Sequence, residues 1–247
     1  MNVHRTLGLL AAGAVVAGSL GAAPAIGQDD MPDTQLSAEA RATPSKAGTK
    51  RHPQGVAIEA TAKIGSEAGY EPPIVTGVDL LVGKGLVMNA NDYVKCAKRV
   101  LDREGPEGCP KKSIMGRADV TARADTVITH PDVVLINAGW KQTFAYTTLY
   151  QPALVQETIV VKRTRMSGKW AHRESFRVPE HLQVVAGVPI QVTAARLRVG
   201  GKPYAPDYIA STSCPKGGWK YRATAYYLYS TGATGQDTFE SSVPCTK

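Results

Sequence analysis

Apolar and polar residues alternate along much of the chain after residue 55, and a period of two indicates β-strands with one buried face. The clearest strand runs from about Trp219 to Tyr229, where four aromatic residues and two alanines fall on one face. A glycine-rich turn at 231–235 follows, and a second strand from Phe239 to Pro244 can run back beside the first. These residues predict a hairpin near the C-terminus.

The same alternation recurs at several places between residues 56 and 212. Strands are expected at 56–64, 78–82, 120–124, 132–137, 142–150, 159–161, 184–198 and 207–212. One short helix is expected from Asp92 to Arg103, with Asn91 as its cap and Gly105 and Pro106 as its end. Short strands separated by turns, with almost no helix, predict an all-β fold, an antiparallel β-sandwich over residues 54–247.

The first 25 residues have the pattern of an export signal. Arg5 gives a positive start, Leu7 to Leu20 is apolar or small, and Ala23-Pro24-Ala25 fits the cleavage pattern. The alternative is an uncleaved membrane anchor, because the apolar run is nearly long enough to span a bilayer. Residues 26–53 are polar and their few apolar residues show no period, so a flexible linker is expected, a disordered N-terminal arm.

Four cysteines in an exported chain favour disulfide bonds over metal binding. Of the three possible pairings we expect Cys96 with Cys109 and Cys214 with Cys245, because each pair brackets a turn that brings its members together. No cysteine has a second Cys or a His two to four residues away, which argues against a zinc site. We expect no metal and no other cofactor.

Charge narrows the choice of partner. The formal charge is +8, and removal of the signal takes away one basic residue, Arg5, and no acid. A basic exported chain is weakly attracted to polyanions, so an anionic cell-envelope polymer or a carbohydrate is the expected partner. Export argues against a nucleic-acid partner, and no membrane span is expected after signal cleavage.

Two Cys-Pro-Lys turns carry a family resemblance. The chain has a cysteine, a short helix, and Gly108-Cys-Pro-Lys-Lys-Ser113 with Gly116 shortly after; later come Ser213-Cys-Pro-Lys-Gly-Gly218, a strand and Cys245. This arrangement resembles uncharacterised secreted β-sandwich proteins of high-GC Gram-positive bacteria, over residues 55–247. The resemblance implies an immunoglobulin-like, disulfide-bonded extracellular fold. It brings no catalytic residues with it.

Catalytic motifs are scarce. The chain has no Gly-x-Ser-x-Gly, phosphate-binding glycine loop, His-Glu-x-x-His or calcium loop. Ser213 to Lys216 matches the Ser-x-x-Lys acylation motif, but that motif needs a helix and here a proline fixes a turn. His172 and Glu174 fall on one strand face as a possible acid and base, although a polar pair at a strand edge is the simpler interpretation. We expect no catalytic residue.

Two groups of residues are candidates for binding. Arg163, Arg165, Lys169 and Arg173 lie on either side of the Ser167-Gly168 turn, where a cationic ribbon is expected, and the alternative is a solvated hairpin. Trp219 and Tyr221, with Tyr227 and Tyr229, form a row that either stacks sugar rings or belongs to the core.

Together these features favour a secreted, non-catalytic interaction module of the extracellular space or cell envelope, with an unspecified partner. The alternatives are a secreted hydrolase whose site is assembled from distant residues, and a structural spacer domain.

Overall fold

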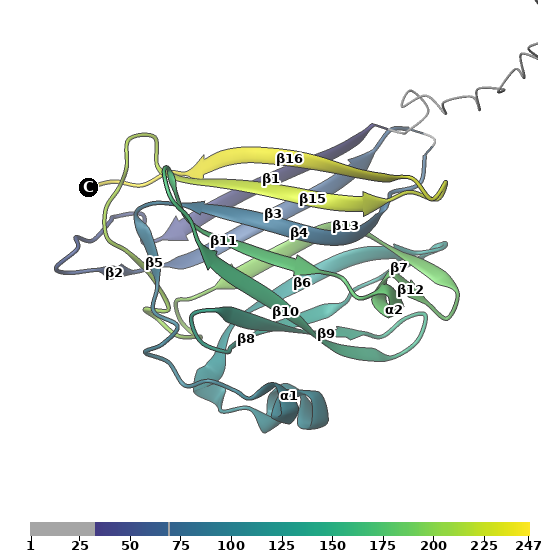
Figure 1. Ribbon diagram of the computed structural model, residues 1–247, viewed down its shortest axis with the longest axis horizontal. Helices are drawn as coiled ribbons and strands as arrows, with labels where there is room; N and C mark the ends of the chain where they lie inside the picture. The colour runs from purple at the N-terminus through teal and green to yellow at the C-terminus, as the bar shows by residue number, and fades with distance from the viewer. Residues whose placement is uncertain (1–32, 69) are drawn as a thin grey trace, which may run out of the picture. The chain divides into compact units, whose positions relative to one another are not determined.

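A computed structural model describes residues 33–68 and 70–247 (Figure 1). The predicted export signal, residues 1–25, lies outside this range. The strands are β1 (Thr34–Thr43), β2 (Gln54–Gly55), β3 (Ala57–Ser66), β4 (Ile74–Gly83), β5 (Leu86–Met88), β6 (Ile114–Ala124), β7 (Val127–Thr129), β8 (Asp132–Asn137), β9 (Gln142–Leu149), β10 (Val155–Arg165), β11 (Trp170–Arg177), β12 (Val184–Val185), β13 (Val188–Val199), β14 (Ile209–Ser211), β15 (Trp219–Leu228) and β16 (Thr234–Val243). The helices are α1 (Lys98–Glu104), α2 (Glu180–Gln183) and two 3-10 turns, η2 (Gly105–Gly108) and η3 (Lys111–Ser113).

The all-β expectation is confirmed, but the immunoglobulin-like β-sandwich is wrong. Eleven antiparallel strands follow one another in the order β1-β3-β13-β6-β8-β9-β10-β11-β4-β15-β16 and curve into one nearly closed barrel (Figure 1). Alternating strands build a sandwich or a barrel equally well, because both bury one face of each strand. The difference lies in the long-range pairings, such as β11 with β4 and β13 with both β3 and β6, which join all the strands into one sheet.

The barrel closes where β1 and β16 come together, at a seam without a backbone ladder. Side chains bridge the seam instead. The amide of Leu36 donates to Asp237 Oδ2 at 2.5 Å, and the hydroxyl of Tyr221 donates to the Ala38 carbonyl at 3.0 Å. Both contacts use backbone groups of β1 that point away from β3.

A flexible linker was expected at 26–53; residues 26–32 of it lie outside the described range, and within that range β1 overturns the expectation. Residues 34–43 pair with β3 along their whole length, from Thr34 opposite Ser66 to Thr43 opposite Ala57. The inward positions alternate regularly, but after Leu36 they are all alanines. Strand pairing and barrel curvature, rather than large apolar side chains, therefore hold this segment in place.

The predicted helix is shorter than expected and begins later. α1 has seven residues and no side-chain cap; Asn91 instead accepts a hydrogen bond from the Trp140 amide. Cys96 and Cys109 form a disulfide that closes this excursion, as predicted. Leu101 of α1 packs with the disulfide on the outer face of β8 and β9, against Val134, Ile136, Phe144 and Tyr146. Both faces of β8 are therefore buried, which explains its continuous apolar run.

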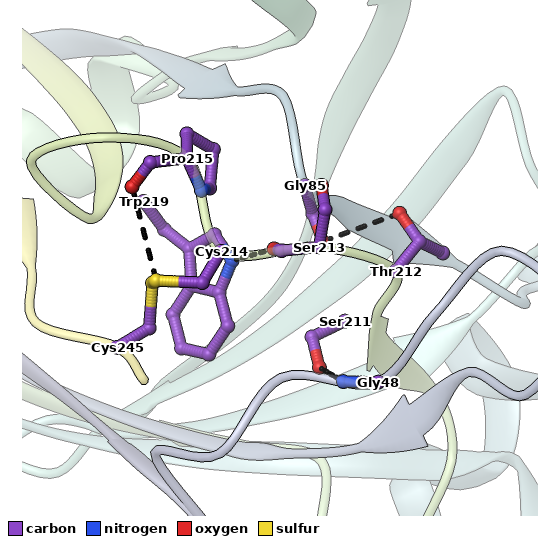
Figure 2. Close-up of a disulfide and its surroundings, with 9 residues drawn as sticks. All are labelled: Gly48, Gly85, Ser211, Thr212, Ser213, Cys214, Pro215, Trp219 and Cys245. Carbon is purple, nitrogen blue, oxygen red and sulfur yellow. Dashed lines mark hydrogen bonds between the residues drawn. A yellow bond between two sulfur atoms is a disulfide. The ribbon is translucent and has the colours of Figure 1, made fainter. Parts of the chain in front are cut away.

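A small sheet, β2-β14-β5, lies at the end of the barrel where β15 begins. Its residues pack with Trp219 and Tyr208 in a buried cluster. The predicted disulfide Cys214–Cys245 is present at this end (Figure 2). It joins the two ends of the β15–β16 hairpin, and the prediction of this hairpin is also confirmed. Trp219 Nε1 donates to the Ser213 carbonyl at 2.8 Å. We refer to this end as the disulfide end, and to the opposite one as the α2 end.

Gly85, in the turn between β4 and β5, shows how closely the chain packs at the disulfide end. Its φ of +104° favours glycine, and a Cβ would lie 2.7 Å from the Ser213 carbonyl oxygen and 2.9 Å from the Trp219 ring. The Gly85 carbonyl accepts the Thr212 amide at 2.8 Å and the Thr212 hydroxyl at 3.5 Å, and Figure 2 draws the hydroxyl contact. Within the described residues, no helix combines the length and the apolar character needed to cross a bilayer.

Candidate functional site

An apolar cavity of about 260 Å³ lies inside the barrel. Six alanines from four strands line it: Ala62, Ala145, Ala194, Ala195, Ala223 and Ala225. Eight strands make a barrel that side chains can just fill, so a barrel of eleven strands with methyl groups inside leaves its axis empty. Aliphatic side chains such as Leu149 and Ile159 complete the wall, and we call this space the alanine cavity.

Leu182 lines the alanine cavity at the α2 end. The short helix α2 follows β11 and leads into β12, and its Leu182 is buried while its neighbours Glu180 and His181 are exposed. Leu182 packs with Ala145 and Ile159 among the cavity-lining residues. Leu182 on this four-residue helix therefore lines the α2 end of the alanine cavity together with other aliphatic side chains such as Leu149 and Ile190.

A second cavity, of about 170 Å³, lies nearer the disulfide end of the same lumen. Consecutive inward positions line the two spaces in turn: Ile159 lines the alanine cavity and Val161, two residues further along β10, lines the second. Most of the second lining is also apolar. Its polar members are Thr143, Arg163, His172, Glu174, Tyr208, Lys220 and Tyr221, and we call this space the polar cavity.

Arg163 is the centre of the polar cavity's hydrogen bonds. Its side chain is 1% exposed, and its Nε donates to Glu174 Oε1 at 2.8 Å. Nη1 donates to the Trp140 carbonyl at 2.9 Å, and Nη2 donates to Thr143 Oγ1 at 3.1 Å. Burial alone would lower the pKa of Arg163, but Glu174 and the Tyr208 hydroxyl together outweigh it and raise this pKa, so the guanidinium stays charged.

His172 lies beside this ion pair and is 6% exposed. Its Nε2 is 3.8 Å from Glu174 Oε1, which is too long for a hydrogen bond. Burial lowers the pKa of His172; Glu174 opposes this effect and Arg163 adds to it. The imidazole is therefore neutral at pH 7. The sequence prediction that His172 and Glu174 share a face is confirmed, and that face lines the lumen.

The residues predicted to form a cationic ribbon do not share one surface. Arg163 points into the barrel, whereas Arg165, Lys169 and Arg173 are exposed. Arg165 lies over the Trp140 ring, Lys169 pairs with Glu240 at 2.9 Å, and Arg173 lies 4.0 Å from Asp79. On a regular strand Arg163 and Arg165 would point to the same side, because they are two residues apart. Arg165 is the last residue of β10, where the regular strand ends, and its side chain is exposed.

The aromatic row of β15 faces inward. Trp219 is 1% exposed, and Tyr227 and Tyr229 are also buried. Tyr221 is half-buried, lines the polar cavity, and reaches the β1 backbone through its hydroxyl. The aromatic row therefore belongs to the core of the barrel and does not form an exposed platform for sugar rings.

Sequence reasoning missed the features that make the lumen. Thr143 and Tyr208 come from segments with no motif, and their link, 3.4 Å between the two hydroxyls, depends on long-range pairing. The inward alanines did carry a signal. Alanine alternates with polar residues in β3 and in the middle of β15, and alanine in place of larger residues on an inner face indicates a lumen that is not filled.

Among the residues that the structure describes, neither ring nitrogen of His172 is hydrogen-bonded to a hydroxyl or thiol, as an activated nucleophile would require. The same residues contain no group of His, Cys, Asp and Glu that could hold a metal ion. Comparisons with protein-family models, with curated proteins and with solved structures find no match to this chain.

Proposed function

We propose that this chain is an exported, non-catalytic binding protein that holds an apolar small molecule in its barrel lumen. The observation that carries the proposal is the alanine cavity, which is about 260 Å³ and almost entirely apolar in its lining. An apolar cavity of about 150 Å³ in another protein takes up benzene. Sites for small molecules typically combine an apolar wall with a few polar groups, as the two cavities here do together.

Export is supported by the signal pattern of residues 1–25 and by the two disulfides, because disulfides persist in oxidising compartments. The sequence led us to expect an anionic cell-envelope polymer or a carbohydrate as partner; the proposed partner is instead a small guest molecule inside the barrel. The protein would carry or sequester that molecule outside the cytosol.

The test uses an apolar fluorophore, N-phenyl-1-naphthylamine, whose emission rises when it leaves water. We expect saturable binding to the protein isolated from the culture medium, which also tests export. Ala62→Phe places a large side chain in the alanine cavity and should weaken binding at least tenfold, because the guest and the ring compete for the same volume.

Lys63→Phe is the matched control. Lys63 is the next residue of β3, is exposed, and points away from the lumen, so the same ring is added on the other side of the sheet. This variant should bind the fluorophore as the unaltered protein does. Equal binding by the Ala62→Phe protein, or no saturable binding by any form, would overturn the proposed function.

A further inference from the structure

The polar cavity has a balanced charge. Arg163 and Glu174 form an ion pair at 2.8 Å, and three nitrogens of the guanidinium already donate to protein acceptors. A carboxylate or phosphate that entered the cavity would need to displace Glu174, or would lie close to its negative charge in a site with little water. The ion pair therefore opposes an anionic guest, although the cavity contains an arginine.

Lys220 does not alter this balance. It lines the edge of the polar cavity but is an exposed residue at the start of β15, where water screens its charge. The other polar groups of the lining are the ion pair, the neutral imidazole of His172, and the hydroxyls of Thr143, Tyr208 and Tyr221. The Tyr221 hydroxyl already donates to the Ala38 carbonyl. A cationic guest is not favoured either, because the one carboxylate among these lining residues, Glu174, is already paired with Arg163.

His172 has hydrogen-bonding capacity that the protein does not use. In the described part of the chain its ring nitrogens make no hydrogen bond, and the 3.8 Å approach to Glu174 is its one polar contact. The ring is more than nine-tenths buried and lines the polar cavity. A polar ring that faces a cavity without a protein partner is suited to a guest that completes its hydrogen bonds.

We propose that the guest carries an uncharged oxygen, a hydroxyl or a carbonyl, that hydrogen-bonds to His172, while its apolar part extends into the alanine cavity. This inference rests on the proposed function and specifies its ligand class as neutral amphiphiles. A neutral imidazole offers one N–H donor and one acceptor nitrogen, so it can bind either oxygen. Consecutive inward positions of β10 place the two cavities next to each other along the barrel.

The experiment compares four molecules with similar chains, 1-octanol, 2-octanone, octanoate and octane, as competitors of the bound fluorophore at pH 8. At this pH octanoate is ionised and His172 is neutral. We expect octanol and octanone to compete about tenfold better than octane, the size of effect that one buried hydrogen bond gives. Octanoate should compete less well than octanol by at least the same factor.

His172→Phe supplies the second readout. It keeps a ring of similar size and removes both nitrogens, so octanol should lose its advantage over octane while octane binding is kept. His181→Phe is the control, because His181 is exposed on α2 at the opposite end of the barrel. The ranking of the four molecules on the unaltered protein tests the inference even if the His172 variant does not fold.

The outcomes separate the inference from the proposed function. Competition by octanoate that equals or exceeds that of octanol would overturn the inference and identify Arg163 as an anion site. Equal competition by all four molecules would also overturn it, but would leave apolar binding intact. If the fluorophore binds and none of the four displaces it, the fluorophore lies outside the lumen, and both the proposed function and the inference fail.

Discussion

Single residues inside the barrel have environments that their sequence neighbours do not reveal. Arg163 and Lys162 are adjacent, yet one is buried in an ion pair and the other is exposed. The burial of Arg163 makes the pair sensitive to truncation, because removal of either member leaves a charge in the interior. His172 lies beside the pair, and its burial lowers its pKa and keeps the imidazole neutral.

Burial of His172 predicts a loss of stability in mild acid. Its pKa is lowered in the folded protein, so below the ordinary value of about 6.5 the unfolded chain binds a proton that the folded chain does not. The free energy of unfolding should therefore fall as the pH drops from 6.5 toward the folded pKa. Urea unfolding at pH 7.5 and pH 5.0 measures this change.

His172→Gln should reduce the difference between the two pH values, and His130→Gln should leave it unchanged, because His130 is exposed. The lowered pKa values of Glu59 and Glu240 act in a separate range, below about 4.5. A difference that persists in full in the His172→Gln protein would contradict this interpretation.

Among the elements, the hairpin of β15 and β16 and both disulfides could be predicted from the sequence, because each depends on residues close together in the chain. The helix was harder. Asn91 precedes a helical pattern and would be a good cap, but tertiary structure uses its side chain to accept the Trp140 amide. The loop from residue 89 to 94 is fixed instead by Asn137, whose amide donates to three of its carbonyls.

The Cys96–Cys109 disulfide should stabilise α1 more than any contact on the helix surface. Replacement of both cysteines by serine should lower the free energy of unfolding by roughly 3 kcal/mol, the chain-entropy value for a loop of this length. Amide exchange should become faster first in α1, which packs on the outside of the barrel through Leu101.

Lys98→Gln is the comparison for this prediction. It removes the exposed ion pair with Asp102 and should cost less than about 1 kcal/mol. If the cysteine variant and the Lys98 variant have equal stability, the disulfide does not have the role assigned to it here.

At the scale of the whole barrel, alternation predicts which face of each strand is buried but not how the strands are ordered. The sandwich and the barrel share the inward faces of β3, β4 and β15; pairings between distant segments, such as β11 with β4, distinguish them. β1 was missed for a related reason. Its inner face consists mainly of alanines, which contribute little hydrophobicity, and it becomes a strand because β3 provides a complete partner.

The seam predicts an alternating pattern of amide exchange along β1. The Leu36 amide points toward β16, so in an antiparallel pair the amides of Ala38 and Ala40 do the same, whereas those of Ser37 and Glu39 face β3. We expect fast exchange at Ala38 and Ala40 and slow exchange at Ser37 and Glu39, measured residue by residue by NMR. Uniform protection along β1 would mean that a backbone ladder closes the barrel.

Because side chains close the seam, the circumference of the barrel is not fixed by backbone hydrogen bonds alone. A ring of strands joined everywhere by main-chain bonds has a fixed circumference, and a wider occupant can enter it only if a ladder breaks. Here Asp237 of β16 and Tyr221 of β15 bind backbone groups of β1 through rotatable side chains. The wall can stretch at this one line while every ladder stays whole, so the lumen can adapt to occupants of different thickness.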